Sequence, residues 1–127
     1  MFKTSKFGIA TLAISLVLLT GCSQSSQKAT YGSIDELKTA FENAGGDCSE
    51  WVQDNAVERA LQSGNCSSSN VLSIYANQED ANEAAKNIEK LLTEFGLTPH
   101  LLVGENWIVN DPDVAEYQDD LGGILIQ

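Results

Sequence analysis

The chain has 127 residues and a formal net charge of −11. A chain of this length forms one small domain, for which burial of a core alone gives marginal stability. The acidic balance excludes nucleic acid and direct adhesion to anionic lipid as functions, because both need basic patches. It is typical of a soluble surface, and it remains compatible with a cationic partner or with Ca²⁺.

The first 21 residues have the pattern of a bacterial export signal. Lys3 and Lys6 form a short positive region, and the apolar run over 7–19 has the length of a signal-peptide core. This run is too short and wrongly flanked for a stable membrane span. The alternatives are an ordinary secretory signal and a buried helix.

The signal ends in Leu19-Thr20-Gly21-Cys22, which resembles the lipobox of bacterial lipoproteins at every position. The resemblance implies that the Cys22 thiol receives diacylglycerol, that cleavage occurs before Cys22, and that acyl chains such as palmitate anchor the protein. Two acyl chains are enough for stable anchoring. The resemblance therefore predicts a lipoprotein of the cell envelope, lipid-anchored to the cell membrane on its extracytoplasmic side.

The predicted mature chain divides into two parts. Removing residues 1–21 removes two of the seven basic residues and none of the 18 acidic ones, which changes the net charge to −13. Residues 22–30, rich in Ser and Gln, are expected to be a flexible tether. Residues 31–127 are expected to form a single domain.

Cys48 and Cys66 remain as an even pair once Cys22 carries lipid, and such a pair in an exported domain predicts a disulfide. The competing interpretation is a metal or redox pair. The chain has no Cys-x-x-Cys motif and only one His, which favours the disulfide. Closing a loop of this size stabilises the folded state by about 3 kcal/mol.

The domain begins with a predicted helix over 34–44. Ser33 and Glu36 form a capping box, and Gly45-Gly46 ends the helix. One helical stripe is apolar and consists of Ile34, Leu37, Ala40, Phe41 and Ala44. Residues 47–55 are ambiguous, residues 56–62 favour a strand over a helical turn, and the turn signals at 63–65 and 67–70 surround Cys66.

The second half alternates strands and helices. Residues 71–76 predict a strand, and Asn77 caps a long helix that Gly96 ends. Residues 101–103 and 107–109 predict a hairpin around Gly104-Glu105, in a type II′ turn with Gly first. The apolar stripe of the long helix consists of Ala81, Ala84, Ala85, Ile88, Leu91, Leu92 and Phe95.

Asp111 and Pro112 predict the start of a short helix, which Gly122-Gly123 closes before a final strand at 124–126. From about residue 71 the order is therefore β-α-β-β-α-β. This order predicts an α+β fold of the ferredoxin-like split βαβ type, with both helices on one face of an antiparallel sheet. The N-terminal helix and the disulfide-stapled segment are additions to it.

Two sequence patterns in the second half resemble small exported domains of unknown function from Gram-positive bacteria, above all actinobacteria. They are Val103-Gly104-Glu105-Asn106-Trp107-Ile108-Val109-Asn110 and Leu121-Gly122-Gly123. The resemblance implies export and implies no activity.

Strand alternation predicts two faces of the sheet. The face under the helices would carry Leu72, Ile74, Leu101, Val103 and Ile108, and the other would carry Val71, Ser73, Tyr75, His100, Leu102, Trp107 and Val109. The second face is a candidate binding surface, with Tyr75 and Trp107 as rigid anchors and His100 at its edge. The alternative is that the N-terminal helix covers this face.

Catalytic and metal-binding patterns are missing from the sequence. His100 is the only histidine, whereas a nucleophile needs a partnered base and a zinc site needs about three clustered ligands. We therefore expect no enzyme, no metal and no cofactor. Asp111, Asp113, Glu116, Asp119 and Asp120 favour a solvated helix face over a calcium site. A second acidic group is formed by Asp47, Glu50, Asp54 and Glu58.

The sequence thus predicts a tethered, non-enzymatic module that binds another envelope protein or ligand. The alternative is an acidic, inhibitor-type lipoprotein that neutralises a cationic hydrolase or an antimicrobial peptide. The first hypothesis requires the face with Tyr75 and Trp107 to be open.

Overall fold

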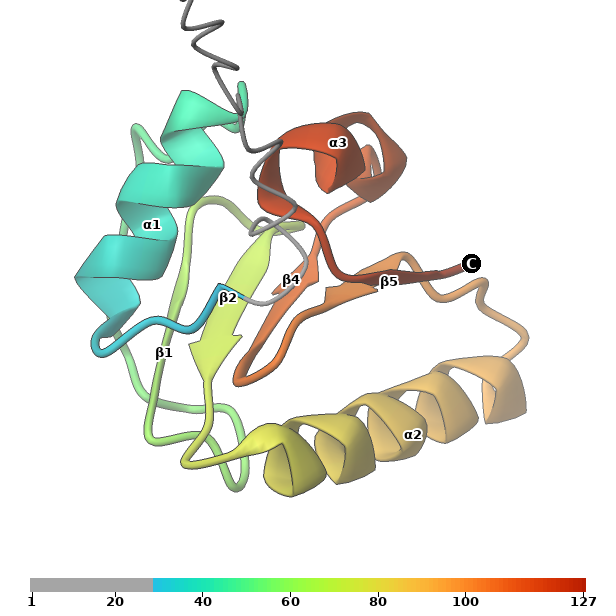
Figure 1. The fold of residues 1–127 in the computed structure, drawn as a ribbon. Helices are drawn as coiled ribbons and strands as arrows, with labels where there is room; N and C mark the ends of the chain where they lie inside the picture. Colours follow the sequence, from blue (N-terminus) through green and yellow to red (C-terminus); the bar gives the residue numbers. More distant parts are fainter. Residues whose placement is uncertain (1–28) are drawn as a thin grey trace, which may run out of the picture.

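The computed structural model describes residues 29–127 (Figure 1). The predicted signal peptide and Cys22 lie outside the described residues. Within this range, no helix has the length and apolar character needed to cross a membrane. The helices and strands in chain order are α1 (Ile34–Asn43), β1 (Gln62–Asn65), β2 (Val71–Ile74), α2 (Gln78–Glu94), β3 (Leu101–Val103), β4 (Trp107–Asn110), the 3-10 helix η2 (Val114–Tyr117), α3 (Gln118–Leu121) and β5 (Ile124–Ile126).

The strands form one antiparallel sheet in the order β1-β2-β4-β3-β5, with helices on both faces (Figure 1). One face packs against α1, η2 and α3, and the other against α2. The first cluster contains Ile34, Leu37, Phe41, Leu72, Ile74, Leu102, Trp107, Val109, Val114, Tyr117 and Leu121. The second contains Tyr75, Ala81, Ala84, Ala85, Leu101, Val103 and Ile108. The predicted α+β class is confirmed.

The finer ferredoxin-like arrangement is not confirmed. That arrangement places both helices of the repeat on one face, whereas α2 and the η2–α3 pair lie on opposite faces. The final strand, β5, pairs with β3 at the outer edge of the sheet. In the predicted split βαβ fold the final strand would lie beside β2. That position is taken by β1, which precedes the predicted motif in the chain.

Both long helices begin as predicted. The Ser33 hydroxyl accepts the Glu36 N–H at 3.3 Å, and the side-chain Oδ1 of Asn77 accepts the Asp80 N–H at 2.9 Å. These bonds satisfy backbone donors that a helix start leaves unpaired. Gly45, with φ of 104°, follows the end of α1.

The prediction for residues 56–65 is wrong. Residues 56–61 are irregular, and the expected turn at 63–65 is instead most of strand β1. Pairing with β2 and an isolated bridge between Val52 and Asn65 determine this conformation. Gly64 is required there because a Cβ would lie 2.4 Å from the ring of Trp51.

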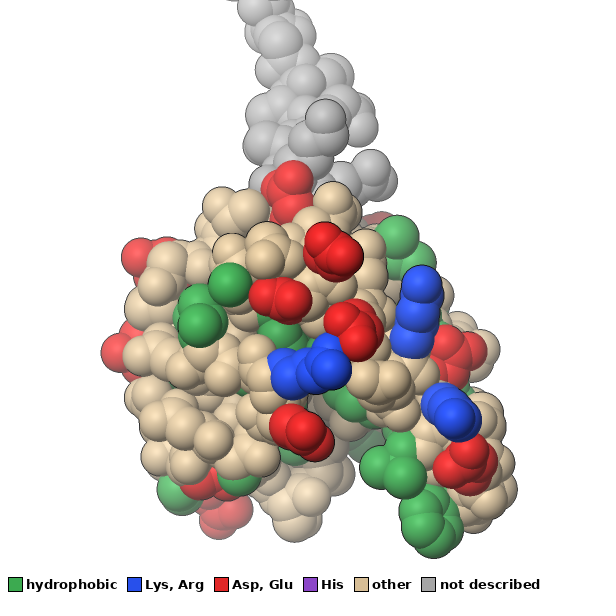
Figure 2. Space-filling view, turned by 90° about the horizontal axis from the view of Figure 1, so that it is seen from below, with side chains coloured by type: hydrophobic (Ala, Val, Ile, Leu, Met, Phe, Trp, Pro, Cys, Tyr) green, Lys and Arg blue, Asp and Glu red, His purple; other side chains and the backbone are tan. Residues whose placement is uncertain are grey.

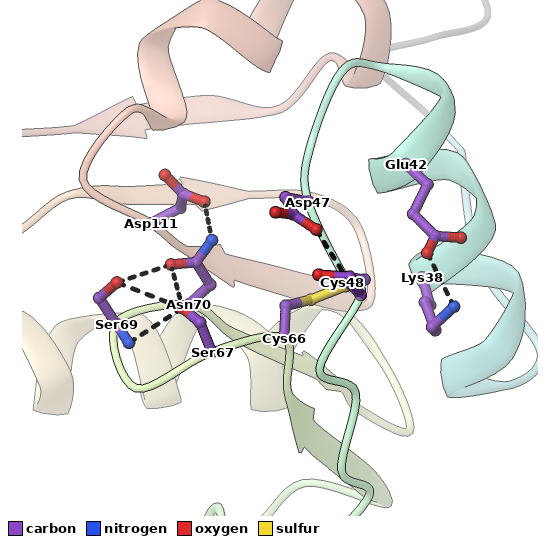
Figure 3. Close-up of a disulfide and its surroundings, with 10 residues drawn as sticks. Lys38, Glu42, Asp47, Cys48, Cys66, Ser67, Ser69, Asn70 and Asp111 are labelled. Atoms are coloured by element: carbon purple, nitrogen blue, oxygen red, sulfur yellow. Dashed lines mark hydrogen bonds and ion pairs between the residues drawn. A yellow bond between two sulfur atoms is a disulfide. The ribbon is translucent and has the colours of Figure 1, made fainter.

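The predicted disulfide between Cys48 and Cys66 is confirmed (Figure 3). Both cysteines are buried, and both belong to the core cluster that includes α1. The bond attaches the irregular segment after α1 to the end of β1. It therefore stabilises a part of the chain that has little regular structure.

The predicted helix after Pro112 is two short pieces, η2 and α3, rather than one. Asp111 does not act as an ordinary helix N-cap. Its Oδ1 accepts the N–H of Asp113 at 2.7 Å, in a turn that precedes η2. Phe41 packs edge-on against Tyr117, with ring centroids 5.0 Å apart, and this contact joins the pieces to α1.

Candidate functional site

Trp107 is fully buried, on the face of the sheet that α1 covers. Its Nε1–H donates to the carbonyl of Ala29 at 3.0 Å, and its ring meets Tyr31 edge-on at 5.9 Å. Ala29 belongs to the segment predicted to be a tether, so the last tether residues already contact the domain. Trp107 is a core anchor and not an exposed binding residue.

Gly104 lies against this tryptophan and does not have the predicted role in a type II′ turn. Its φ is not positive, and its N–H donates to the carbonyl of Trp107 at 2.9 Å, so Glu105 and Asn106 form the turn. A Cβ on Gly104 would lie 1.9 Å from Cε2 of Trp107. Glycine is needed here for ring packing.

Tyr75 lies on the opposite face of the sheet, toward α2, and is also buried. Its hydroxyl shares a hydrogen bond with the Ser73 hydroxyl at 3.1 Å, and burial raises the pKa of Tyr75. The predicted surface with Tyr75 and Trp107 as joint anchors is therefore wrong. The cause is the register of β2 against β4, in which Ile74 lies opposite Trp107.

His100 stands apart from both aromatic residues, at the start of β3. Its carbonyl accepts the N–H of Asp111 at 3.1 Å. The side chain is partly buried, and its Nδ1 atom is buried without a hydrogen-bond partner. The structure does not bring His100 together with Tyr75 and Trp107 into one site.

The carboxylates of the acidic groups do not gather around a common point. In residues 29–127, no group of three or more His, Cys, Asp or Glu side chains is arranged to hold a metal ion. Asp47 accepts the N–H of Ser49 at 2.9 Å, and this hydrogen bond lowers the pKa of Asp47. Asp54 accepts from the side chain of Asn65 at 2.7 Å. These two carboxylates stabilise local turns.

Asp111 is the buried member of the acidic groups (Figure 3). Its Oδ2 accepts from Nδ2 of Asn70 at 2.7 Å, which ties η2 to the loop after the disulfide. Burial raises the pKa of Asp111, the hydrogen bond from the Asp113 N–H opposes this, and the charges of Asp113 and Glu116 add to it.

Ionisation of the buried Asp111 carboxyl is expected to destabilise the folded state as the pH rises, and Asp111→Asn should remove this pH-dependent loss. The folded state holds the Asp111 proton more tightly than the unfolded state, whose pKa is near the ordinary 3.8. This contribution to stability is therefore present at low pH and is lost as the pH rises through the folded-state pKa. Urea unfolding between about pH 3 and pH 7 should show the variant gaining stability relative to the original chain. A pH-independent difference would contradict this effect.

A groove lies between α2 and the loop before β1. It has a volume of about 290 Å³. Tyr75, Ala84 and Ile88 belong to the second core cluster or pack against it, and they form its apolar base. The remaining lining residues are Val57, Glu58, Arg59, Asn87 and Leu91.

The apolar surface continues beyond the groove along α2. Leu91 is 55% exposed and Phe95 75% exposed, although both belong to the apolar stripe predicted for this helix. The helix has 17 residues and is about 26 Å long, whereas a four-residue strand spans about 13 Å. The last turns of α2 therefore extend beyond the sheet. The sequence could have indicated this surface, because the predicted helix after Asn77 is much longer than the predicted strands that it packs against.

Arg59 closes one side of the groove. It forms an ion pair with Glu83 of α2, which raises the pKa of Arg59. Its φ of 68° is in the left-handed region that non-glycine residues rarely adopt. Such strained positions occur often at binding sites. Figure 2 looks onto this side of the molecule and shows hydrophobic side chains at the surface among acidic and basic ones.

Comparison with protein-family models, curated proteins and solved structures finds no match to this chain. The site offers an apolar base, exposed aliphatic and aromatic side chains, and charged residues at the rim. Exposed apolar patches with a polar rim are a common feature of interaction surfaces.

Proposed function

We propose that this chain is a membrane-anchored extracytoplasmic lipoprotein whose domain binds another envelope protein or peptide without catalysis. The lipobox pattern ending in Cys22 supports the anchor. The groove and the exposed Leu91 and Phe95 beside it support the binding role. This surface replaces the predicted one, because Tyr75 and Trp107 are both buried and lie on opposite faces of the sheet.

The partner that suits this surface is an amphipathic helical segment with basic residues on its polar side. An apolar face of such a segment fits beside α2, where Leu91 and Phe95 project into solvent. Two ion pairs lie at or beside the groove, Arg59 with Glu83 and Lys90 with Glu94, and Glu58 adds a further carboxylate to its lining. The net charge of −13 on the predicted mature chain also attracts a cationic partner over a longer range.

The second candidate is the inhibitor that neutralises a cationic hydrolase or antimicrobial peptide. The segment 113–121 favours this candidate, because it contains exposed carboxylates and no basic residue. The exposed carboxylates are those of Asp113, Glu116, Asp119 and Asp120. Binding of this kind depends on charge alone. It would be screened by salt and would not depend on the groove.

The groove can be tested with a synthetic amphipathic helical peptide of Leu and Lys. We expect Leu91→Ser together with Phe95→Ser to weaken its binding about tenfold or more, because each side chain loses apolar contact. Fluorescence anisotropy of the labelled peptide at two salt concentrations measures the change. The salt series separates the charge contribution from the apolar one.

Val52→Ser is the matched control, because Val52 is 59% exposed and does not line the groove. It should leave peptide binding unchanged. Equal losses in Val52→Ser and in the Leu91 and Phe95 variant would overturn the groove as the site. Binding that disappears in salt and ignores all three substitutions would favour the inhibitor hypothesis.

A further inference from the structure

Strand β5 has an open edge. It pairs with β3 on one side and ends the sheet on the other (Figure 1). Among the described residues, no backbone hydrogen bond from outside β3 reaches Ile124, Leu125 or Ile126. An edge strand of this kind presents unpaired N–H and C=O groups, which only another strand can satisfy as a row.

The opposite edge of the sheet is protected. Val52 and Asn65 exchange backbone hydrogen bonds at 2.9 Å, and the Asn55 N–H donates to the Ser63 carbonyl at 3.0 Å. The disulfide at Cys48 attaches the start of this covering segment to the end of β1. The chain therefore covers one edge of its sheet and leaves the other uncovered.

The open edge is a short strand of three residues, and shortness is one way in which natural proteins limit pairing at an edge. It lacks two other protections, because residues 122–127 are Gly-Gly-Ile-Leu-Ile-Gln, without a charged side chain and without proline. Ile124 is 67% exposed, while Leu125 packs against the α1-side cluster and Ile126 against the α2-side cluster. Alternation places Ile124 on the same side as Ile126.

We propose that β5 pairs with β5 of a second copy of this chain, antiparallel and about a two-fold axis at Leu125. In this register Ile124 lies opposite Ile126 of the second copy, so the exposed isoleucine gains an apolar, β-branched neighbour. The two sheets become one continuous sheet.

Charge selects a second copy as the occupant. Two chains of net charge −11 repel each other over most of their surfaces. The segment 122–127 carries no charged side chain, so the paired strands themselves bring no like charges together. The sequence Ile-Leu-Ile is also symmetric about its centre, which matches the requirement of a two-fold interface that the same patch serves both copies.

Sedimentation of the full chain in a density-matched detergent tests this pairing. We expect a protein mass of twice 13.7 kDa at high concentration. Ile124→Lys should raise the dimer dissociation constant by about tenfold or more, because an edge lysine opposes strand pairing. Circular dichroism of the variant confirms that it has folded.

Val52→Lys is the matched control, since Val52 is similarly exposed at the opposite edge, and it should leave the dimer unchanged. Leu125→Cys in a Cys22→Ser background provides a second readout, because the two thiols would face each other across the axis and added oxidised glutathione would convert them to an intermolecular disulfide. A monomer at all concentrations would overturn the proposal. A dimer that survives Ile124→Lys and fails to cross-link at residue 125 would also overturn it, because the contact would then lie elsewhere.

Discussion

Replacing Cys48 and Cys66 together with alanine is expected to lower the free energy of unfolding by about 3 kcal/mol. The disulfide closes a loop with a sequence separation of 18, and its loss restores that loop's freedom in the unfolded chain. It is also expected to release the segment after α1, which depends on turns rather than on regular structure. For a domain of this size the melting temperature should fall by about 12 °C or more.

Thermal and urea unfolding of the double variant, monitored by circular dichroism, measures this loss. Cys22→Ser is the control, because it removes the third thiol without affecting the disulfide. A loss well below about 1 kcal/mol would mean that the core around α1 holds the segment without the covalent bond. The backbone hydrogen bonds between Val52 and Asn65 should open more often in the double variant. Faster hydrogen exchange of the Asn65 amide would detect this opening.

Gly104→Ala is expected to destabilise the fold by about 3 kcal/mol, through a clash in the core. The new Cβ would lie 1.9 Å from Cε2 and 2.1 Å from Nε1 of Trp107. The indole cannot move away freely, because it is fully buried and its Nε1–H is bonded to the carbonyl of Ala29. Urea unfolding and the near-ultraviolet signal of Trp107 should both change.

Two variants separate the clash from a general effect of alanine. Gly32→Ala should be tolerated, because its nearest neighbour is the flexible carboxylate of Glu36 at 3.6 Å. Trp107→Leu removes the ring atoms that Gly104→Ala would strike. The double variant should therefore lose less stability than the sum of the two single variants. Strict additivity would contradict the clash.

The local rules of helix formation could be read from the sequence. Ser33 and Asn77 predicted the starts of α1 and α2, and Gly45 marked the end of the first helix. These predictions succeed because a helix cap depends on residues within one turn of each other. The pairing of Cys48 with Cys66 was also accessible, since the pair remains once Cys22 is set aside.

The candidate site was not predictable in the same way. Alternation correctly placed Leu72 and Ile74 on one side of β2, and Tyr75 on the other. In the observed pairing of β2 with β4, Ile74 lies opposite Trp107, so these two residues share a face and Tyr75 does not share it. A shift of one residue exchanges the two faces of a strand. Register depends on the whole sheet and cannot be derived from one strand.

The sequence by itself determined the acidic charge, the disulfide pair and the two capped helices, because each depends on composition or on residues close together in the chain. Only the tertiary structure decided that β1 joins the sheet at 62–65, that α2 and α3 lie on opposite faces, and that Trp107 is buried. It also decided that α2 extends beyond short strands and leaves Leu91 and Phe95 exposed. These features depend on strand register and on relative element lengths, which are set when distant segments pack together.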